Sequence, residues 1–176
     1  GDGSLAAQLP AFAEAIVITH WTRKADGWHC APAEIAPLYP QDQSDYTACM
    51  LGLRDYVGKN GFPGVVLGLS GGIDSALVAA IGVDALGADR VRTVMMPSPY
   101  TADISWIDAR DMAQRLGVRY DEISIVPMFD AFRASLAAEF AGCKEDATEE
   151  NIQARIRGTL LMALSNKSGS IVLTTG

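Results

Sequence analysis

From residue 64 onward, the hydrophobic pattern alternates between short apolar runs and longer amphipathic stretches. Short runs rich in β-branched residues are typical of buried strands, and apolar residues at three- and four-residue spacing are typical of helices. This β-α-β-α order predicts an α/β fold: an open parallel twisted sheet of Rossmann type with helices on both faces. The predicted strands are Gly64–Leu69, Val91–Met96, Tyr120–Ile125 and Ser170–Thr174, and the predicted helices are about Ser75–Leu86, Ala102–Leu116, Pro127–Phe140 and Thr148–Ser165.

The first of these strands leads into a glycine-rich octet, Gly68-Leu-Ser-Gly-Gly-Ile-Asp-Ser75. A buried strand followed by such a turn and a helix N-terminus leaves backbone N–H groups uncovered. The helix dipole adds partial positive charge there, so the pattern predicts a phosphate-binding loop. A Walker loop ends in Gly-Lys-Ser/Thr, whereas Ile73 and Asp74 precede the final serine here. The acid indicates a different reaction at a triphosphate.

Each residue type in Ser70–Ser75 suits a phosphate. Gly71 and Gly72 permit a positive φ and let a phosphate approach the main chain. Ser70 and Ser75 add hydroxyl donors, and Asp74 can bind a Mg²⁺ ion that bridges phosphate oxygens. A plain turn with an acid at the helix start would explain a single Gly-Gly pair. It does not explain the whole hexapeptide between a buried strand and a helix.

Charge and hydropathy exclude two classes of partner. The formal charge is −7, from 21 acidic and 14 basic residues, which argues against the basic patch of a nucleic-acid-binding protein. No apolar run approaches the ~18–20 residues of a membrane span. No charged-then-apolar leader opens the sequence. We therefore expect a cytoplasmic protein with no nucleic-acid or membrane partner.

Cysteine and histidine usage limits the chemistry further. Cys30, Cys49 and Cys143 are widely spaced without a CxxC pair, so neither a disulfide framework nor a zinc site is indicated. The two histidines, His20 and His29, both lie in the N-terminal segment. A histidine-based triad or a histidine-rich metal site in the main domain is therefore excluded.

The N-terminal quarter differs in composition from the rest of the chain. The segment Ala13–Trp21 predicts a strand, and residues 30–44 contain three prolines at short intervals. Because proline restricts both itself and the preceding residue, we interpret residues 30–44 as a linker over a surface. Ser44 is then the predicted N-cap of a helix that Asn60-Gly61 closes.

A second informative string, residues 148–158, begins a predicted helix with Thr148 as its N-cap. Asn151 and Arg155 are four residues apart, so they lie on the same helix face. An amide beside a guanidinium suits a polar anionic ligand. Spacing alone favours a solvated face in which Glu150 pairs with Arg155 or Arg157.

The hexapeptide Ser70–Ser75 resembles the SGGxDS signature of the ATP pyrophosphatases, the PP-loop superfamily, at every position. In that superfamily the loop holds the β- and γ-phosphates as a leaving pyrophosphate while the α-phosphate is attacked. The resemblance implies an adenine-nucleotide α-hydrolase-like fold. It also implies a metal-binding Asp74 and an ATP site made of Gly68, Leu69, Ser70, Gly71, Gly72, Ile73, Asp74 and Ser75.

Several enzymes share this signature, and the string 148–158 distinguishes among them. Together with Gly52–Val57 and Lys59–Gly64, it resembles the glutamine-dependent NAD synthetases. The resemblance covers roughly residues 46–176. It implies that Asn151 and Arg155 contact deamido-NAD and that Thr175 belongs to the ATP site.

The resemblance implies ATP-dependent amidation of deamido-NAD to NAD through an acyl-adenylate, with release of AMP and pyrophosphate. Mg²⁺ would accompany ATP, and ammonia would come from glutamine. No catalytic residue is implied beyond the ATP and metal site. In the family a second subunit completes the substrate site, so we expect a homo-oligomer. The alternatives are another PP-loop adenylating enzyme, of the GMP synthetase or tRNA-modifying type, or a nucleotide-binding fragment that is inactive by itself.

The resemblance also suggests a domain organisation. Residues 1–29 are similar to the closing strands of a nitrilase-like glutaminase domain, residues 30–44 form the linker, and residues 45–176 form a synthetase domain truncated at its C-terminal end. The Cys-Lys-Glu triad of that glutaminase would lie upstream of Gly1. Cys30 does not have the sequence context of the nucleophile, so we interpret it as structural.

Overall fold

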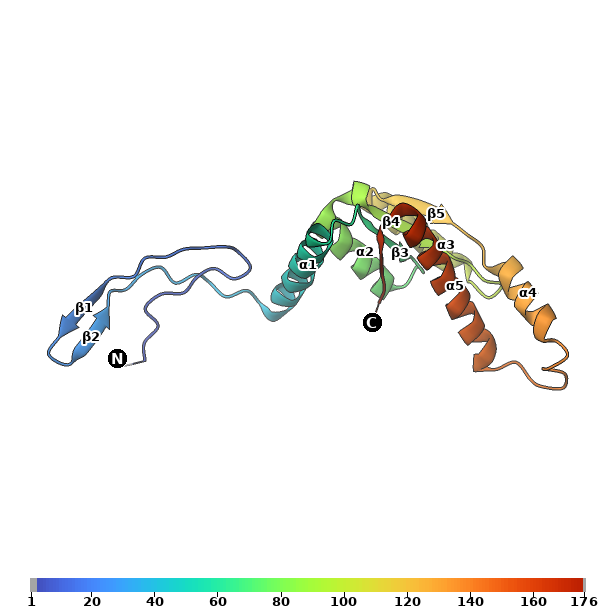
Figure 1. The fold of residues 1–176 in the computed structure, drawn as a ribbon, viewed down its shortest axis with the longest axis horizontal. Coiled ribbons are helices and arrows are strands. Elements are labelled where there is room, and N and C mark those ends of the chain that lie inside the picture. Colours follow the sequence, from blue (N-terminus) through green and yellow to red (C-terminus); the bar gives the residue numbers. More distant parts are fainter. Residues whose placement is uncertain (1–2, 176) are drawn as a thin grey trace. The chain divides into compact units, whose positions relative to one another are not determined.

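The computed structural model describes residues 3–175 of the chain. It forms two compact units, with the boundary after Leu51. Helix α1 (Gln41–Lys59) crosses that boundary and contributes residues to both units. The second unit contains the sheet and the remaining helices (Figure 1).

The second unit is built on a four-stranded parallel sheet with the order β5-β4-β3-β6. The strands are β3 (Val65–Gly68), β4 (Val91–Met95), β5 (Arg119–Glu122) and β6 (Ile171–Leu173). Residues 65–67 of the central strand β3 are almost fully buried, as expected for a parallel strand covered on both faces. The strand order reverses between β3 and β6, and such switch points are where open α/β sheets bind ligands.

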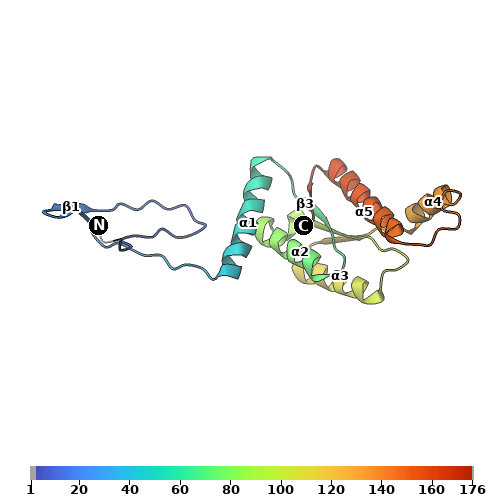
Figure 2. The same ribbon diagram turned by 90° about the horizontal axis from the view of Figure 1, so that it is seen from below.

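Helices cover both faces of this sheet (Figure 2). One face carries α1, α2 (Ile73–Leu86) and α3 (Asp103–Leu116), and the other carries α4 (Val126–Leu136) and α5 (Ala147–Ser168). A short 3₁₀ helix, Ala88–Arg90, precedes β4. The alternating side chains of β3 divide between the two cores, which is why each face needs its own helical layer. The core of the α1–α2–α3 face includes Val57, Leu67, Ala79 and Ala109, and that of the opposite face includes Val66, Val94, Phe129 and Ile156.

The predicted parallel α/β sheet is confirmed, and the differences are confined to element ends. Helix α2 begins at Ile73, two residues before the predicted start, because Gly72 has the extended conformation of an N-cap. The third predicted strand ends at Glu122, not Ile125. Helix α4 ends at Leu136, before the predicted Phe140, since the side chains around that end are mostly exposed and offer little packing.

Two predicted N-caps are wrong. Helix α1 starts at Gln41, not after Ser44, because the Ser44 N–H already makes a helical hydrogen bond to the Pro40 carbonyl (2.9 Å). Helix α5 is capped by Asp146 instead of Thr148. The Asp146 carboxylate accepts the Thr148 N–H (2.8 Å), and Glu149 accepts the Asp146 N–H (2.8 Å), which is a capping box.

In the first unit, β1 (Trp21–Lys24) and β2 (Gly27–Cys30) form an antiparallel hairpin. The predicted strand Ala13–Trp21 is wrong except at Trp21, because a strand needs a paired neighbour and residues 14–20 have none among the described residues. Ala36 is the only buried hydrophobic residue described in this unit. The hairpin therefore has no core of its own.

Candidate active site

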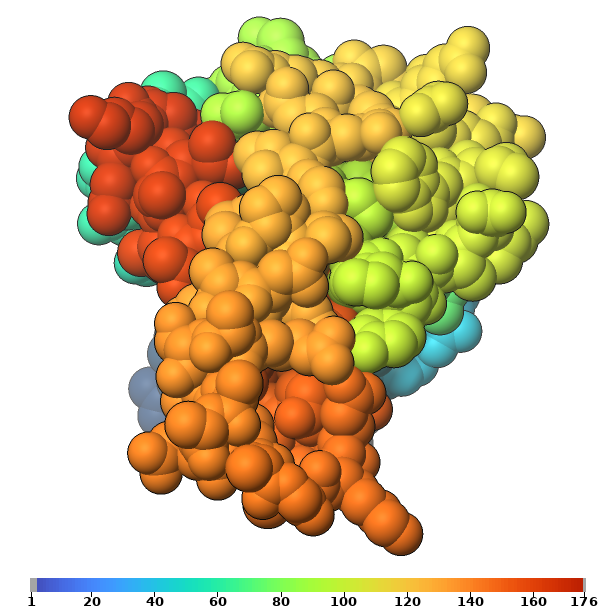
Figure 3. All heavy atoms as spheres, turned by 90° about the vertical axis from the view of Figure 1, so that its right-hand side faces the viewer, coloured from blue at the N-terminus to red at the C-terminus, as the bar shows by residue number. Residues whose placement is uncertain are grey.

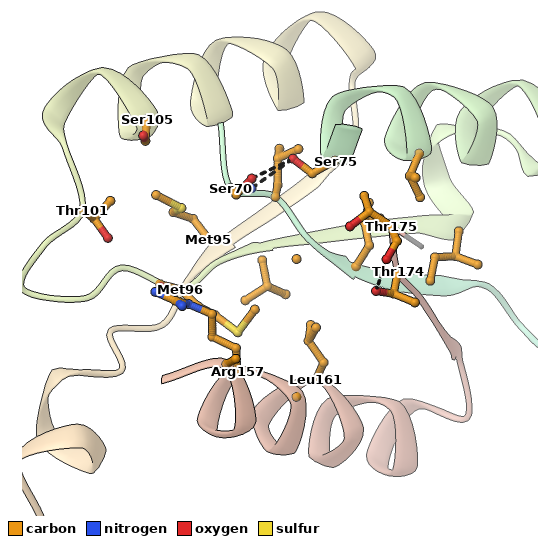
Figure 4. A pocket seen from close by; sticks show the side chains of 18 of the residues that line it. Ser70, Ser75, Met95, Met96, Thr101, Ser105, Arg157, Leu161, Thr174 and Thr175 are labelled. Carbon is orange, nitrogen blue, oxygen red and sulfur yellow. Dashed lines mark hydrogen bonds between the residues drawn. The ribbon is translucent and has the colours of Figure 1, made fainter. Parts of the chain in front are cut away.

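A pocket of about 720 Å³ lies at the carboxyl ends of β3, β4 and β6 (Figure 4). It occupies the switch point of the sheet, where the order of the strands predicts a ligand site. Its walls come from the loop after β3, the end of β4 and its following loop, the middle of α5 and the residues after β6. The lining includes Gly68, Ser70, Ser75, Met96, Tyr100, Thr101, Ser105, Arg157, Leu161, Thr174 and Thr175.

The loop after β3 is held in shape by two serine hydroxyls. The Ser75 Oγ donates to the Gly72 carbonyl (3.0 Å) and accepts the Ser70 N–H (3.2 Å). The Ser70 Oγ accepts the Gly72 N–H (3.2 Å) and lies 3.1 Å from the Ser75 Oγ. The two serines therefore fix the turn before any ligand arrives, and this lowers the ordering cost of binding.

The two glycines of the loop have different tasks. Gly71 has a φ of +84°, and a Cβ there would overlap the main-chain oxygen of Ser105 in α3. Only glycine fits both conditions. Gly72 has a φ of −86°, so of the two glycines only Gly71 uses the positive φ that glycine permits.

The N-terminus of α2 presents free backbone donors at this loop. Because the first helical hydrogen bond runs from the Ala76 N–H to the Gly72 carbonyl (3.2 Å), the N–H groups of Ile73, Asp74 and Ser75 have no intrahelical acceptor. No side chain caps the helix start. Together with the helix dipole, these donors form a site suited to phosphate.

Asp74 lies in the first turn of α2 with an exposed side chain. Among residues 3–175 there is no group of three His, Cys, Asp or Glu residues able to enclose a metal. A single accessible carboxylate still fits Mg²⁺, which is typically held by one or two carboxylates together with phosphate oxygens and water. Asp74 thus fits a metal that arrives with its nucleotide.

The predicted ATP-site residues divide between two pockets. Gly68, Leu69, Ser70, Ser75 and Thr175 line the large pocket. Gly71, Gly72 and Ile73 face a second pocket of about 400 Å³ between the loop and α3, and Leu69 lines this one too. Asp74 lines neither.

The two predicted deamido-NAD residues lie elsewhere on α5. Asn151 and Arg155 are exposed and line neither pocket. The Arg155 Nη1 donates to the Asn151 main-chain carbonyl one helical turn earlier (3.1 Å), so the two residues are in contact. The alternative pairing with Glu150 is wrong, because neither Arg155 nor Arg157 forms an ion pair in the described structure. The described residues of this chain do not bring Asn151 and Arg155 to the loop.

Sequence reasoning missed Arg157 as a pocket residue. Its Nε donates to the Met96 carbonyl at the end of β4 (3.1 Å), and burial lowers the pKa of its guanidinium. The spacing of Ala154, Arg157, Gly158 and Leu161 on α5, all of which line the pocket, follows the i, i+3, i+4, i+7 pattern of one helix face. This spacing in the sequence could have identified Arg157 as a member of the pocket-lining face of α5.

Tyr100, on the loop after β4, links the rim of the pocket to the segment before α5. Its hydroxyl donates to Glu145 (3.4 Å), and Glu145 also accepts from Arg133 of α4 (2.8 Å). In the space-filling view, the orange segment that contains α4 and the following loop lies along the yellow-green segment after β4 (Figure 3). The rim is thus tied to α4 by surface contacts.

Comparison with known proteins identifies the family. Residues 46–176 match the sequence model of NAD synthase. The chain belongs to the NAD synthase family. It is 54% identical over 175 residues to a glutamine-dependent NAD(+) synthetase of Rhodobacter capsulatus and 46% identical over 175 residues to one of Acinetobacter baylyi. Each alignment covers 99% of this chain and 32% of the relative, so the chain spans about a third of the length of these NAD synthetases.

Solved structures agree with this assignment. A glutamine-dependent NAD⁺ synthetase of Acinetobacter baumannii, solved in complex with adenosine diphosphate, superposes with a TM-score of 0.91 at 47% identity. That alignment covers 99% of this chain and 33% of the other. An NH₃-dependent NAD synthetase of Campylobacter jejuni gives a TM-score of 0.69 at 31% identity, over 78% of this chain and 58% of that one. None of the helices described in this NAD synthase chain is long and apolar enough to cross a membrane.

Proposed function

We propose that this chain forms the ATP-binding part of a glutamine-dependent NAD synthetase, which amidates deamido-NAD with release of AMP and pyrophosphate. The observation that carries the proposal is the preformed Ser70–Ser75 loop at the start of α2, opening on a pocket of about 720 Å³ at the sheet's switch point. That volume lies within the ~300–1,000 Å³ of ordinary ligand sites. The relative solved with adenosine diphosphate supports a nucleotide as the occupant.

In the proposed reaction a carboxylate oxygen of deamido-NAD attacks the α-phosphorus of ATP. The bond from the α-phosphorus to the bridging oxygen breaks, and pyrophosphate leaves with that oxygen. Ammonia then attacks the acyl carbon, and AMP leaves with the former carboxylate oxygen. Both partners in the first step are anions, so the protein must mainly neutralise charge and align the groups. The free N–H groups of α2 and the Ser70 and Ser75 hydroxyls are suited to hold the departing pyrophosphate.

Asp74 is the residue that would hold Mg²⁺ in this proposal. Mg²⁺ supplies charge neutralisation of the triphosphate when it binds. The carboxylate would otherwise repel a bare phosphate chain, so nucleotide and metal are expected to bind together. Asp74 remains exposed beside the N-terminus of α2, where a hydrated ion has room to approach.

We propose further that Asn151 and Arg155 bind deamido-NAD at a site completed by a second copy of the chain. Both side chains are exposed and line neither pocket, which supports a site completed from outside the described chain. The homo-oligomer predicted from the family resemblance would supply the remaining contacts.

The first unit supports the proposed domain organisation. Residues 3–29 have no buried side chain, and Ile16 is 97% exposed. Such a segment packs on something larger, and we propose that this is a glutaminase domain that supplies ammonia, with residues 30–44 as linker and 45–176 as synthetase domain. The predicted cytoplasmic location belongs to the same proposal.

A second candidate function is nucleotide binding without turnover. The chain spans about a third of its relatives' length, and the predicted deamido-NAD residues lie outside the nucleotide pocket. Both observations favour a function in which this chain binds Mg-ATP by itself and converts it to products only as a segment of a longer protein. The other PP-loop enzymes are disfavoured by the match to the NAD synthase family.

The test compares this chain alone with a chimera in which it replaces the matching segment of the Rhodobacter capsulatus synthetase. Each protein receives Mg-ATP and ammonium with deamido-NAD, with XMP or with tRNA, and the products are separated by chromatography. The proposal predicts AMP, pyrophosphate and NAD from the chimera with deamido-NAD only. ADP with phosphate, or equal turnover with XMP, would contradict it. Mg-ATP binding by the lone chain without products would support the second candidate.

A further inference from the structure

Arg157 stands out among the residues that line the large pocket. It is the only charged side chain in the described part of that lining. Figure 4 shows it extending from α5 towards Met96 at the end of β4, with the labelled Ser70 and Ser75 on another side of the pocket. The site thus has a cation on α5, and Ser75 of the first turn of α2 forms another part of its wall.

The guanidinium of Arg157 is only partly used by the protein. Its Nε donates to the Met96 carbonyl (3.1 Å), and the described residues give no acceptor to its two Nη groups. No carboxylate pairs with it in residues 3–175. Five other arginines of the same unit, Arg92, Arg110, Arg115, Arg119 and Arg133, each pair with an acidic side chain. Arg54, Arg90 and Arg155 donate to main-chain carbonyls without an ion pair among the described residues, but none of them lines the pocket.

A half-buried cation without a carboxylate partner is costly, because it loses hydration without an opposite charge in return. Burial lowers the pKa of the Arg157 guanidinium, and no acidic group offsets that effect. The cost falls when an anion enters the pocket and accepts from the Nη groups. The planar guanidinium matches a phosphate group in two-point geometry.

We propose that Arg157 is a nucleotide-contacting residue whose Nη groups bind a phosphate group of ATP. The inference rests on the proposed function, because that function puts ATP in this pocket. Two anion-binding points, Arg157 and the N-terminus of α2, fix the direction of the triphosphate as well as its position. Such alignment is what a reaction between two anions requires.

A competing role is purely structural: Arg157 holds the Met96 carbonyl and so shapes the pocket. The two roles differ in which ligands they affect. A phosphate contact matters for ATP and AMP but not for adenosine, whereas a distorted pocket wall weakens all three.

The experiment titrates the full chain calorimetrically with Mg-ATP, AMP and adenosine. We expect Arg157→Met to weaken ATP binding about 10-fold or more, the size of one charged hydrogen-bonded contact, and to change adenosine binding less than about 2-fold. Lys59→Met is the matched control. It removes one positive charge from an exposed pair with Asp55, away from both pockets, and should leave both affinities unchanged.

Thermal unfolding without ligand supplies an independent readout. Arg157→Met should melt at the same or a higher temperature than the unsubstituted chain, since it removes an unpaired half-buried charge. If this variant does not fold, Arg157→Lys keeps the charge and loses the two-point geometry. It should then weaken ATP binding several-fold and leave adenosine binding unchanged.

The outcomes separate this inference from the proposed function. Unchanged ATP affinity in Arg157→Met, or equal losses for ATP and adenosine in either variant, would overturn the role of Arg157 while leaving the pocket as the ATP site. Failure of the unsubstituted chain to bind Mg-ATP would overturn the proposed function and this inference with it.

Discussion

At the scale of single residues, the loop after β3 combines a rigid turn with an exposed acid. Ser70 and Ser75 close the turn through their hydroxyls. The Asp74 side chain is exposed and forms no ion pair among the described residues. Ser75, which holds the turn, is therefore next to Asp74, which we propose binds a ligand. Substitutions can separate the two roles.

Asp74→Asn should abolish the binding of Mg-ATP while leaving the melting temperature within about 2 °C, because an exposed substitution changes stability by only about 0.5 kcal/mol. Titration with ATP in the presence and absence of Mg²⁺ checks this. Metal-free ATP should bind the variant at least as well as the unsubstituted chain, since a repulsive charge is removed. Undiminished Mg-ATP affinity would exclude the metal role.

Gly71→Ala should destabilise the chain by about 2 kcal/mol or more, because it adds a strained positive φ and a backbone overlap with Ser105. Chemical denaturation measures the free energy of unfolding. Gly72→Ala is the control: its φ of −86° suits alanine, and its Cβ would lie 3.4 Å from the Ser70 Oγ. Equal losses in the two variants would show that the positive φ and close approach at Gly71 are not decisive.

Arg155→Ala should raise the KM for deamido-NAD far more than the KM for ATP in the chimera, because Arg155 lies outside the nucleotide pocket. Steady-state kinetics with each substrate varied in turn gives both constants. A similar rise in both values would argue that Arg155 serves the nucleotide site instead.

At the scale of elements, local periodicity predicted the strands and helices of the sheet unit, because each element's own residues carry its pattern. The predictions failed where the structure depends on residues that are far apart in the sequence. Residues 14–20 have strand-forming residues but no neighbouring strand among the described residues. The place of Arg157 in the pocket wall depends on α5 passing the end of β4. Sequence order likewise could not place β6 beside β3. The motif residues of the loop were predictable because they are contiguous.

The edge strand β5 contains Asp121, whose ion pairs should make the stability of the fold sensitive to acid. Partial burial alone would raise the pKa of Asp121, but hydrogen bonds from Arg92 (2.6 Å) and Arg119 (3.0 Å) outweigh it and hold that pKa below its usual value. A lowered folded-state pKa stabilises the protein above the unfolded pKa of about 4, and this contribution is lost as the pH falls through the folded value.

We therefore expect the melting temperature to fall as the pH is lowered from about 5 to about 3. Asp121→Asn should flatten that slope. Asp111→Asn, which removes an exposed carboxylate paired with Arg115 on one helix, should flatten it less. Identical slopes in the three proteins would show that the β5 pairs do not contribute.

At the scale of the whole molecule, the pocket of about 720 Å³ lies in the sheet unit, and the chain spans about a third of the length of its NAD synthetase relatives. The sheet unit has two buried cores, whereas the first unit has one buried hydrophobic residue among those described. The preformed pocket supports the proposal that this chain binds ATP, and Asn151 and Arg155 lie outside the lining of that pocket. In the proposed function, a second copy of the chain completes the deamido-NAD site.

In the proposed reaction, the carboxylate of deamido-NAD attacks the α-phosphorus of ATP at this pocket. The most direct measurement uses deamido-NAD labelled with ¹⁸O in the nicotinate carboxylate, incubated with the chimera, Mg-ATP and ammonium. Mass spectrometry of the AMP should show one ¹⁸O atom in each molecule formed from doubly labelled substrate. Unlabelled AMP, or label found in pyrophosphate or phosphate instead, would contradict the account.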